Sequence, residues 1–391
     1  MAHGLSVLVG TTKGAFILNG GENRAGWSVE GPHCDHWGIN HMAGDPATGT
    51  IWAGGGGEWT GAGVWRTDDG GQTWSLSRLS GGQLDGLLAS DPEGAAAVGF
   101  APLPAPAFEE EIAAVWSLGR TNGALYAGTK PASLYRSHDR GETWKKVKAL
   151  TDHESRDSWN AGGAGLTLHT ILSAPDAPER LWVGISAAGV FASEDGGASW
   201  ERRNRRSNAD IVAAPDTSTH PAAGTGGEVG HCVHNMVRAD GAGDLIYMQN
   251  HHGVFRSPDG GRKWETIGQG LPSTFGFPIA VHPRDRNMAW TFPLNGDSQG
   301  RYPIDGRPAV WRTTDGGATW EPMTNGLPER NCFFTVLRQA MATDPGDPAG
   351  VYFGTNTGSI FFSDDEGVSW EEIARHLPTV LCVEVLAREG T

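Results

Sequence analysis

A short motif recurs six times along the 391-residue chain and limits the fold more than any other feature. Each copy has a Ser or Thr, an Asp two positions later, a Gly two positions after that, and a Trp at its eighth position. The copies occupy residues 67–74, 137–144, 193–200, 257–264, 313–320 and 363–370. A motif repeated at intervals of 50 to 70 residues predicts an array of similar structural units.

The residue types of the motif suit a tight turn between two strands. The Asp carboxylate can accept hydrogen bonds from backbone N–H groups of the turn. The Gly can adopt the positive φ that a tight hairpin needs. The Trp can pack between neighbouring sheets. We therefore interpret the motif residues as structural rather than catalytic.

Runs of β-branched and aromatic residues precede the motifs and predict strands. Residues 63–66 lie directly before the first motif, residues 50–53 lie before those, and residues 166–172 form an innermost strand of another unit. A further strand begins near each motif Trp. Four such strands make one blade of a β-propeller, so the pattern predicts an all-β fold.

The two ends of the chain supply a further blade. Residues 5–27 have the pattern of three strands, with Trp27 at the Trp position of a degenerate motif, and residues 379–387 supply the missing innermost strand. We predict a single domain, residues 1–391, that folds as a seven-bladed β-propeller of four-stranded antiparallel blades. Pairing of the N-terminal strands with the C-terminal strand closes the ring and leaves no exposed edge.

The motif resembles the Asp-box, or BNR, repeat of sialidase-like β-propellers, and its six copies extend over most of the chain. The resemblance implies a fold shared with sialidases and other glycosyl hydrolases. The sequence departs from true sialidases, because no Arg-Ile-Pro-type segment precedes residue 67 and only five tyrosines are present. Non-catalytic Asp-box proteins, such as sortilin-type receptors and the photosystem II assembly factor, make an interaction or assembly scaffold the alternative.

The long insertions predict where a site lies. Residues 80–111, 148–165 and 202–230 each precede an innermost strand, and residues 294–308 join the second and third strands of a blade. In a propeller, these connections share the face opposite the Asp-boxes. Extended loops on one face of a rigid scaffold commonly form a binding site. We therefore expect an axial pocket on that face.

Three histidines in innermost strands are candidate metal ligands: His41, His169 and His234. Innermost strands surround the propeller axis, so the three imidazoles could converge there. Three imidazoles with an open position suit zinc, copper or iron. The alternative is that these histidines bond water and neighbouring carbonyl groups.

The same face carries further candidate site residues. For acid–base catalysis we predict His36 and His231 with the carboxylates Glu58 and Glu228. For substrate binding we predict Trp59, His251, His252, Arg301 and Tyr302. Four arginines could hold a substrate carboxylate, namely Arg156, Arg301, Arg307 and Arg338. The predicted function is a hydrolase or lyase that acts on a small molecule or carbohydrate. If the three histidines bind a metal, the metal would assist the reaction.

Charge and composition exclude several classes of partner. The formal net charge is −15, which disfavours binding to nucleic acids and to anionic membranes. No apolar run approaches about 18 residues, and the N-terminus has no basic region before an apolar stretch. The four cysteines are far apart in the sequence and predict reduced thiols in a cytoplasmic protein. A small molecule or sugar is the expected ligand, with a protein partner as the alternative.

Overall fold

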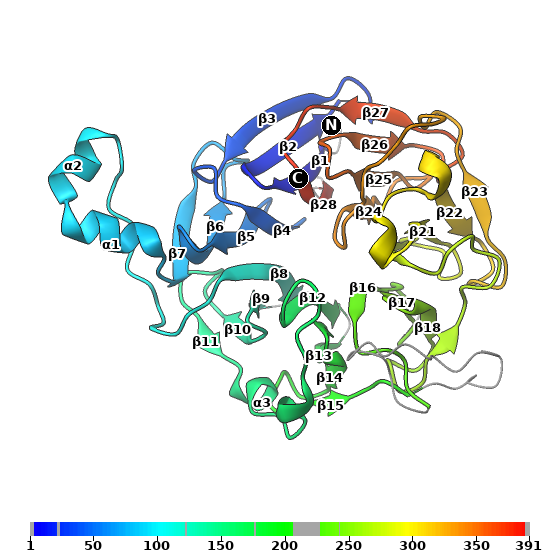
Figure 1. The fold of residues 1–391 in the computed structure, drawn as a ribbon, viewed down its shortest axis with the longest axis horizontal. Coiled ribbons are helices and arrows are strands. Elements are labelled where there is room, and N and C mark those ends of the chain that lie inside the picture. Colours follow the sequence, from blue (N-terminus) through cyan, green and yellow to red (C-terminus); the bar gives the residue numbers. More distant parts are fainter. Residues whose placement is uncertain are drawn as a thin grey trace.

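The structure, a computed structural model, describes residues 4–21, 24–121, 123–175, 177–205, 227–241 and 243–387. Its strands form seven four-stranded antiparallel sheets around a central axis (Figure 1). The predicted seven-bladed β-propeller is therefore confirmed.

Each blade runs from an innermost strand at the axis to an outermost strand at the rim (Figure 1). Blade 1 contains β28 (Val380–Ala387), β1 (Leu5–Thr11), β2 (Gly14–Gly20) and β3 (Ser28–His33). Blade 2 contains β4 (Ile39–Gly44), β5 (Ile51–Gly57), β6 (Gly61–Thr67) and β7 (Ser75–Ser80). Blade 3 contains β8 (Ala114–Thr121), β9 (Ala124–Lys130), β10 (Leu134–Ser137) and β11 (Lys145–Lys146). Blade 4 contains β12 (Thr167–Ala174), β13 (Ala177–Ser186), β14 (Gly189–Ser193) and β15 (Glu201–Arg202).

The other three blades follow the same strand order. Blade 5 contains β16 (Val233–Arg238), β17 (Ile246–Asn250), β18 (Gly253–Ser257) and β19 (Glu265–Thr266). Blade 6 contains β20 (Gly276–Val281), β21 (Ala289–Pro293), β22 (Val310–Thr313) and β23 (Glu321–Met323). Blade 7 contains β24 (Met341–Thr343), β25 (Val351–Gly354), β26 (Ile360–Ser363) and β27 (Glu371–Ala374).

Blade 1 joins the two ends of the chain, as the sequence predicts. The C-terminal strand β28 pairs antiparallel with β1 from Leu5↔Ala387 to Thr11↔Val380. The two termini consequently lie close together in Figure 1. The ring has no free inner strand edge at this seam, so its closure depends on residues at opposite ends of the sequence.

The Asp-boxes form the turns that follow the third strand of blades 2 to 7, and they share one hydrogen-bond pattern. In the first box, the Thr67 hydroxyl donates to Asp69 Oδ1 at 2.7 Å, and Asp69 Oδ1 also accepts from the Thr73 N–H at 2.9 Å. The N–H of Gly71 donates to the Thr67 hydroxyl at 3.0 Å. The equivalent Asp bonds occur in all six boxes. The box residues are therefore structural, as predicted.

The hydrophobic cores lie between neighbouring blades and include hydrogen bonds that the sequence analysis does not predict. Trp52 of blade 2 packs with Val115 and Leu118 of blade 3. In three blades, a Trp of the second strand donates its Nε1–H to a carbonyl in the Asp-box of the next blade. These bonds are Trp52 to Arg140 O at 2.9 Å, Trp182 to Gly260 O at 2.9 Å, and Trp290 to Glu366 O at 3.1 Å.

Three of the insertions contain helices within the described residues, which the all-β prediction does not include. The insertion at 294–308 has only the short 3-10 helices Asp297–Gln299 and Ile304–Gly306. The connection from blade 2 to blade 3 forms α1 (Gln83–Ser90) and α2 (Pro92–Ala97), which project outward from the ring in Figure 1. The connection from blade 3 to blade 4 forms α3 (Lys148–Thr151). Among the described residues, no helix has the length and apolar character needed to cross a bilayer.

Candidate functional site

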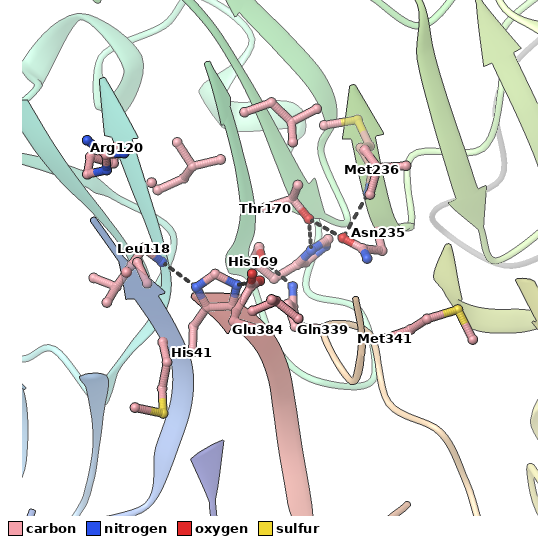
Figure 2. A pocket seen from close by; sticks show the side chains of 18 residues that line it. His41, Leu118, Arg120, His169, Thr170, Asn235, Met236, Gln339, Met341 and Glu384 are labelled. Atoms are coloured by element: carbon pink, nitrogen blue, oxygen red, sulfur yellow. Dashed lines mark hydrogen bonds and ion pairs between the residues drawn. The ribbon is translucent and has the colours of Figure 1, made fainter. Parts of the chain in front are cut away.

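Inner strands of six blades line a cavity of about 290 Å³ on the propeller axis (Figure 2). Side chains from separate blades meet there, including His41, His169, Asn235, Gln339 and Glu384. The axial convergence follows from the fold, because each inner strand presents one face to the axis.

The cavity lies toward the Asp-box side of the ring. Several lining residues, such as Gly44, Arg120 and Val237, sit at or near the final residues of their inner strands. Those strand ends lead into the turns that share a face with the Asp-boxes. We expect the substrate pocket on the opposite face, and that remains a prediction. Residues 206–226 of the predicted insertion at 202–230 lie outside the described residues.

The three histidines predicted as metal ligands make separate hydrogen bonds. His41 Nδ1 accepts from the Leu118 N–H at 3.1 Å, and its Nε2 lies 3.2 Å from a Glu384 oxygen (Figure 2). His169 is buried with Nδ1 3.0 Å from the Thr170 hydroxyl, and burial lowers the pKa of His169 to about 3. His234 Nδ1 lies 2.6 Å from the Gly276 carbonyl oxygen. A site made of His41, His169 and His234 remains a prediction.

His234 instead lies in a cluster with Cys232 and His251. One potential ligand atom from each of the three side chains lies within 4.8 Å of the others. Cys232 directly precedes β16, and His251 lies in the turn between β17 and β18. The His251 N–H donates to the Cys232 carbonyl at 2.9 Å, so strand pairing fixes the two residues side by side. Burial raises the pKa of the Cys232 thiol and lowers the pKa of His234.

Aromatic rings and two arginines border this cluster. The Phe277 ring centroid lies 4.7 Å from that of His234. The guanidinium carbons of Arg338 and Arg301 lie 5.0 and 5.8 Å from the Phe277 ring centroid, within reach of cation–π attraction. Arg301 forms an ion pair with Asp297, whose other oxygen lies 3.8 Å from His251 Nε2.

Arg338 differs from Arg301 in its partners. Within the part of the chain that the structure describes, its side chain forms no ion pair, and its Nε is buried without a hydrogen-bond partner. Burial lowers the pKa of Arg338. The residue as a whole is only partly exposed, and a guanidinium partly removed from water is stabilised by an anionic or carbonyl partner, so Arg338 is the group here most suited to bind one.

Two of the predicted catalytic residues contact each other. His231 Nε2 lies 2.9 Å from Glu228 Oε2, and Arg202 Nη2 lies 2.8 Å from His231 Nδ1. The carboxylate requires Nε2 to donate, so Nδ1 accepts from Arg202 and both ring nitrogens are used. His231 therefore links Arg202 to Glu228. Burial lowers its pKa, and the bond to Glu228 partly opposes that effect.

The other predicted site residues lie in different loops between strands, apart from the His231–Glu228 pair. His36 is exposed in the loop between β3 and β4, and Glu58 is exposed in the turn between β5 and β6, next to the exposed Trp59. His252 follows His251 in its turn, with ring centroids 4.8 Å apart. Tyr302 packs against Phe333, with ring centroids 5.1 Å apart. Among the described contacts, none joins His36 or Glu58 to the His231–Glu228 pair.

The sequence analysis does not name Cys232 or Phe277 as site residues. The sequence does contain a signal for Cys232. It lies two positions before His234, and residues two positions apart in a strand point to the same face. The contribution of His251 depends on the pairing of β16 with β17, which sequence spacing does not give. Arg338 is only one of four arginines considered, and its lack of a partner is visible only in the structure.

Comparisons with known proteins agree with this fold. The family model of the BNR/Asp-box repeat matches residues 135–146. The chain is 23% identical over 288 residues to an oligoxyloglucan-reducing end-specific xyloglucanase of Emericella nidulans, a match that covers 65% of this chain and 31% of that protein. It is 25% identical over 287 residues to a sialidase of Bacteroides fragilis, covering 66% of this chain and 48% of the sialidase.

Solved structures extend the similarity over nearly the whole chain. The GH74 xyloglucanase of Xanthomonas campestris superposes with a TM-score of 0.61 and 18% identity, covering 96% of this chain and 53% of the xyloglucanase. This chain thus spans about half the length of that enzyme and less than half of the two sequence relatives. The chain is a seven-bladed Asp-box β-propeller similar to xyloglucanases and sialidases, without a close match to true sialidases.

Proposed function

We propose that this protein is a carbohydrate-acting hydrolase whose substrate binds on the face opposite the Asp-boxes. The relatives that match by sequence are named as xyloglucanases and a sialidase, enzymes of carbohydrate substrates. The proposal places the substrate over blades 5 and 6, next to the loop that leads into blade 7.

The observation that carries the proposal is the convergence of Phe277, Arg301, Arg338, Asp297 and His251. Aromatic faces with a few fixed polar groups are typical of ligand sites. The loops that supply these residues are held by neighbouring elements, since the Thr335 hydroxyl donates to the Arg301 carbonyl at 2.6 Å. Phe277 is itself buried beneath the two guanidinium groups, so the apolar face for a sugar ring is that of the exposed Phe333, which packs on Tyr302. Arg338, which forms no ion pair among the described residues, supplies a cation for an oxygen of the substrate.

Hydrolysis of a glycosidic bond needs a proton donor and a base. Asp297 is our first candidate, because its carboxylate is 40% exposed and lies beside His251. Glu228 is the second, because its side chain is 32% exposed and His231 holds it in place. In this proposal Arg301 positions Asp297, and Arg202 positions Glu228 through His231.

The test is hydrolysis of a panel of oligosaccharides, including xyloglucan fragments and sialosides, by the wild-type protein. We expect release of reducing sugar from at least one class, and a loss of at least 100-fold in kcat/KM for Asp297→Asn or Glu228→Gln. Asp347→Asn is the matched control, because Asp347 is exposed in the turn between β24 and β25, on the Asp-box face and therefore on the face opposite the proposed site. Equal activity in all three variants would contradict the proposed roles.

The alternative function, a non-catalytic interaction scaffold, has one observation in its favour. Phe333 is 66% exposed and Trp59 is 47% exposed, and both lie on connections of the face opposite the Asp-boxes. Exposed aromatic side chains suit protein interfaces as well as sugar rings. Absence of hydrolysis across the panel, together with absence of oligosaccharide binding by calorimetry, would favour the scaffold.

A further inference from the structure

Cys232, His234 and His251 bring together the side-chain types that bind transition metals. Within the described ranges, this is the one group of three potential ligands that lies within 4.8 Å. We propose that these three residues bind a zinc ion with one open coordination position. The proposal is independent of the hydrolase activity, because metal uptake can be measured without any substrate.

The hydrogen bond of His234 leaves the lone pair of its Nε2 available to bind a metal. His234 Nδ1 lies 2.6 Å from the Gly276 carbonyl oxygen, which can only accept a hydrogen bond. The proton is therefore on Nδ1, and Nε2 carries the lone pair. Ligating histidines usually donate their other ring N–H to a carbonyl or carboxylate, which fixes the ring orientation.

The backbone holds the other two ligands together. The Cys232 carbonyl accepts from the His251 N–H, and Val233 pairs with Asn250 in the ladder between β16 and β17. The Asn250 side chain donates to the Gly230 carbonyl at 2.6 Å and fixes the chain before Cys232. Cys232 and His251 each lie one residue beyond this ladder, so the paired strands position both ligands more accurately than free loops would.

The distances require only a small adjustment on binding. Zinc bonds of about 2.3 Å to sulfur and about 2.0–2.1 Å to nitrogen place tetrahedral ligands roughly 3.3–3.6 Å apart. Ligand atoms that lie within 4.8 Å of one another must therefore approach by up to about 1.5 Å. One thiolate with two imidazoles suits zinc, whereas magnesium and calcium prefer oxygen ligands.

The charges around the cluster indicate what fills the open position. Arg338, Asp297 and Arg301 are the charged groups that act on the Cys232 thiol. Zinc with one thiolate has a net charge of +1, and Arg338 adds a second positive charge with no anion paired to it among the described residues. We therefore infer that the fourth ligand is an anionic oxygen, such as hydroxide or a carboxylate, that also contacts Arg338.

The test is metal binding by the full-length protein after removal of metal with a chelator. We expect one Zn²⁺ per chain by calorimetry and elemental analysis, and a thiolate-to-cobalt charge-transfer absorption when Co²⁺ replaces Zn²⁺. The absorption should disappear in Cys232→Ser, and affinity for Zn²⁺ should fall at least 100-fold in Cys232→Ser and His251→Gln. Circular dichroism checks that each variant is folded.

Matched variants separate this site from other thiols and histidines. Cys332→Ser removes another buried thiol, and His41→Gln removes a histidine of the axial cavity, so both should keep full uptake. Arg338→Met removes a positive charge and should keep or increase Zn²⁺ affinity. Failure to bind Zn²⁺ in stoichiometric amount, or equal uptake by wild type and Cys232→Ser, would overturn the proposal. Loss of uptake in His41→Gln with retention in Cys232→Ser would overturn it in favour of the His41, His169 and His234 set.

Discussion

At the scale of single residues, Arg338 has a guanidinium that destabilises the fold when it has no anion beside it and that is available to bind a ligand. Its Nε is buried without a hydrogen-bond partner and, among the described residues, its side chain forms no ion pair, whereas other arginines with little exposed surface do form one. Arg78, for example, is 2% exposed and contacts Asp85 at 2.5 Å. Arg338 is only partly exposed, and a cation partly removed from water without an ion pair is unfavourable, so its retention beside Cys232, His234 and His251 suggests a ligand that pairs with it.

The first prediction concerns the stability of arginine variants. Arg338→Met should leave the free energy of unfolding unchanged or raise it by about 1 kcal/mol, since an apolar side chain of similar size replaces a cation without a partner. Arg78→Met should lower it by about 3 kcal/mol, because Asp85 loses its ion pair. Denaturant titration measures both. A large loss of stability in Arg338→Met would show that the guanidinium is structurally required.

At the scale of elements, the Asp-box is a carboxylate held by donors within one turn. Hydrogen bonds from the Ser199 hydroxyl and backbone, and from Ser193, lower the pKa of Asp195 to about 2. The pKa of Asp315 falls to about 2 for the same reason, led by the Thr319 hydroxyl. The folded pKa lies below the unfolded value of about 3.9. These bonds therefore make their full contribution to stability only when the pH is above about 3.9.

The second prediction is the pH dependence that follows. Stability contributed by the boxes should be lost as pH falls from about 4 to about 2, because protonation removes the acceptor from the turn. Asp195→Asn should therefore show a smaller decrease in Tm between pH 5 and pH 2.5 than wild type. Scanning calorimetry over this range measures the effect. An unchanged decrease would mean that Asp195 does not contribute, and Asp347→Asn serves as a control outside the boxes.

The third prediction concerns the bonds between blades. Trp182 is 1% exposed, and its Nε1–H bonds the Gly260 carbonyl of the next blade. Trp182→Phe should lower the free energy of unfolding by about 1–3 kcal/mol, through the lost bond and the smaller ring. Trp59→Phe, at an exposed position, should change it by less than about 0.5 kcal/mol. Equal effects in the two variants would contradict a stabilising role for the Trp182 bond.

At the scale of the whole molecule, the ring depends on the pairing of β28 with β1. Seven pairs of residues link the two strands, from Leu5↔Ala387 to Thr11↔Val380. Cys382 and Val383 of β28 are fully buried, so this strand also contributes to the core. The ring is consequently closed both by the backbone hydrogen bonds of β28 and by the packing of its side chains.

The fourth prediction tests ring closure. A chain that ends at Pro378 lacks β28 and exposes the inner edge of β1, which we expect to cause aggregation or loss of the cooperative unfolding transition. Size-exclusion chromatography and thermal denaturation measure both effects. Val368→Ala, at an exposed position of the last Asp-box, should behave like wild type. A monomeric truncated protein with an unchanged Tm would refute the role assigned to β28.

The number of blades, the Asp-box turns and the closure of the ring all follow from the amino-acid sequence. The reason is that these features depend on local chemistry: an Asp that accepts from its own turn, a Gly with positive φ, and strands of alternating character. The helices of the insertion at 80–111 are not predicted, because the motif and the strand pattern that identify the blades do not extend into that insertion.

Which side chains meet, by contrast, is visible only once the blades are packed together. His41, His169 and His234 occupy similar places in their strands, yet each bonds a different neighbour, since register shifts interrupt the pairing of all three strands. The grouping of Cys232 with His251 requires a hairpin contact, and the position of Arg338 above Phe277 requires the packing of blades 6 and 7. Such contacts join residues distant in sequence, so residue type and spacing cannot specify them.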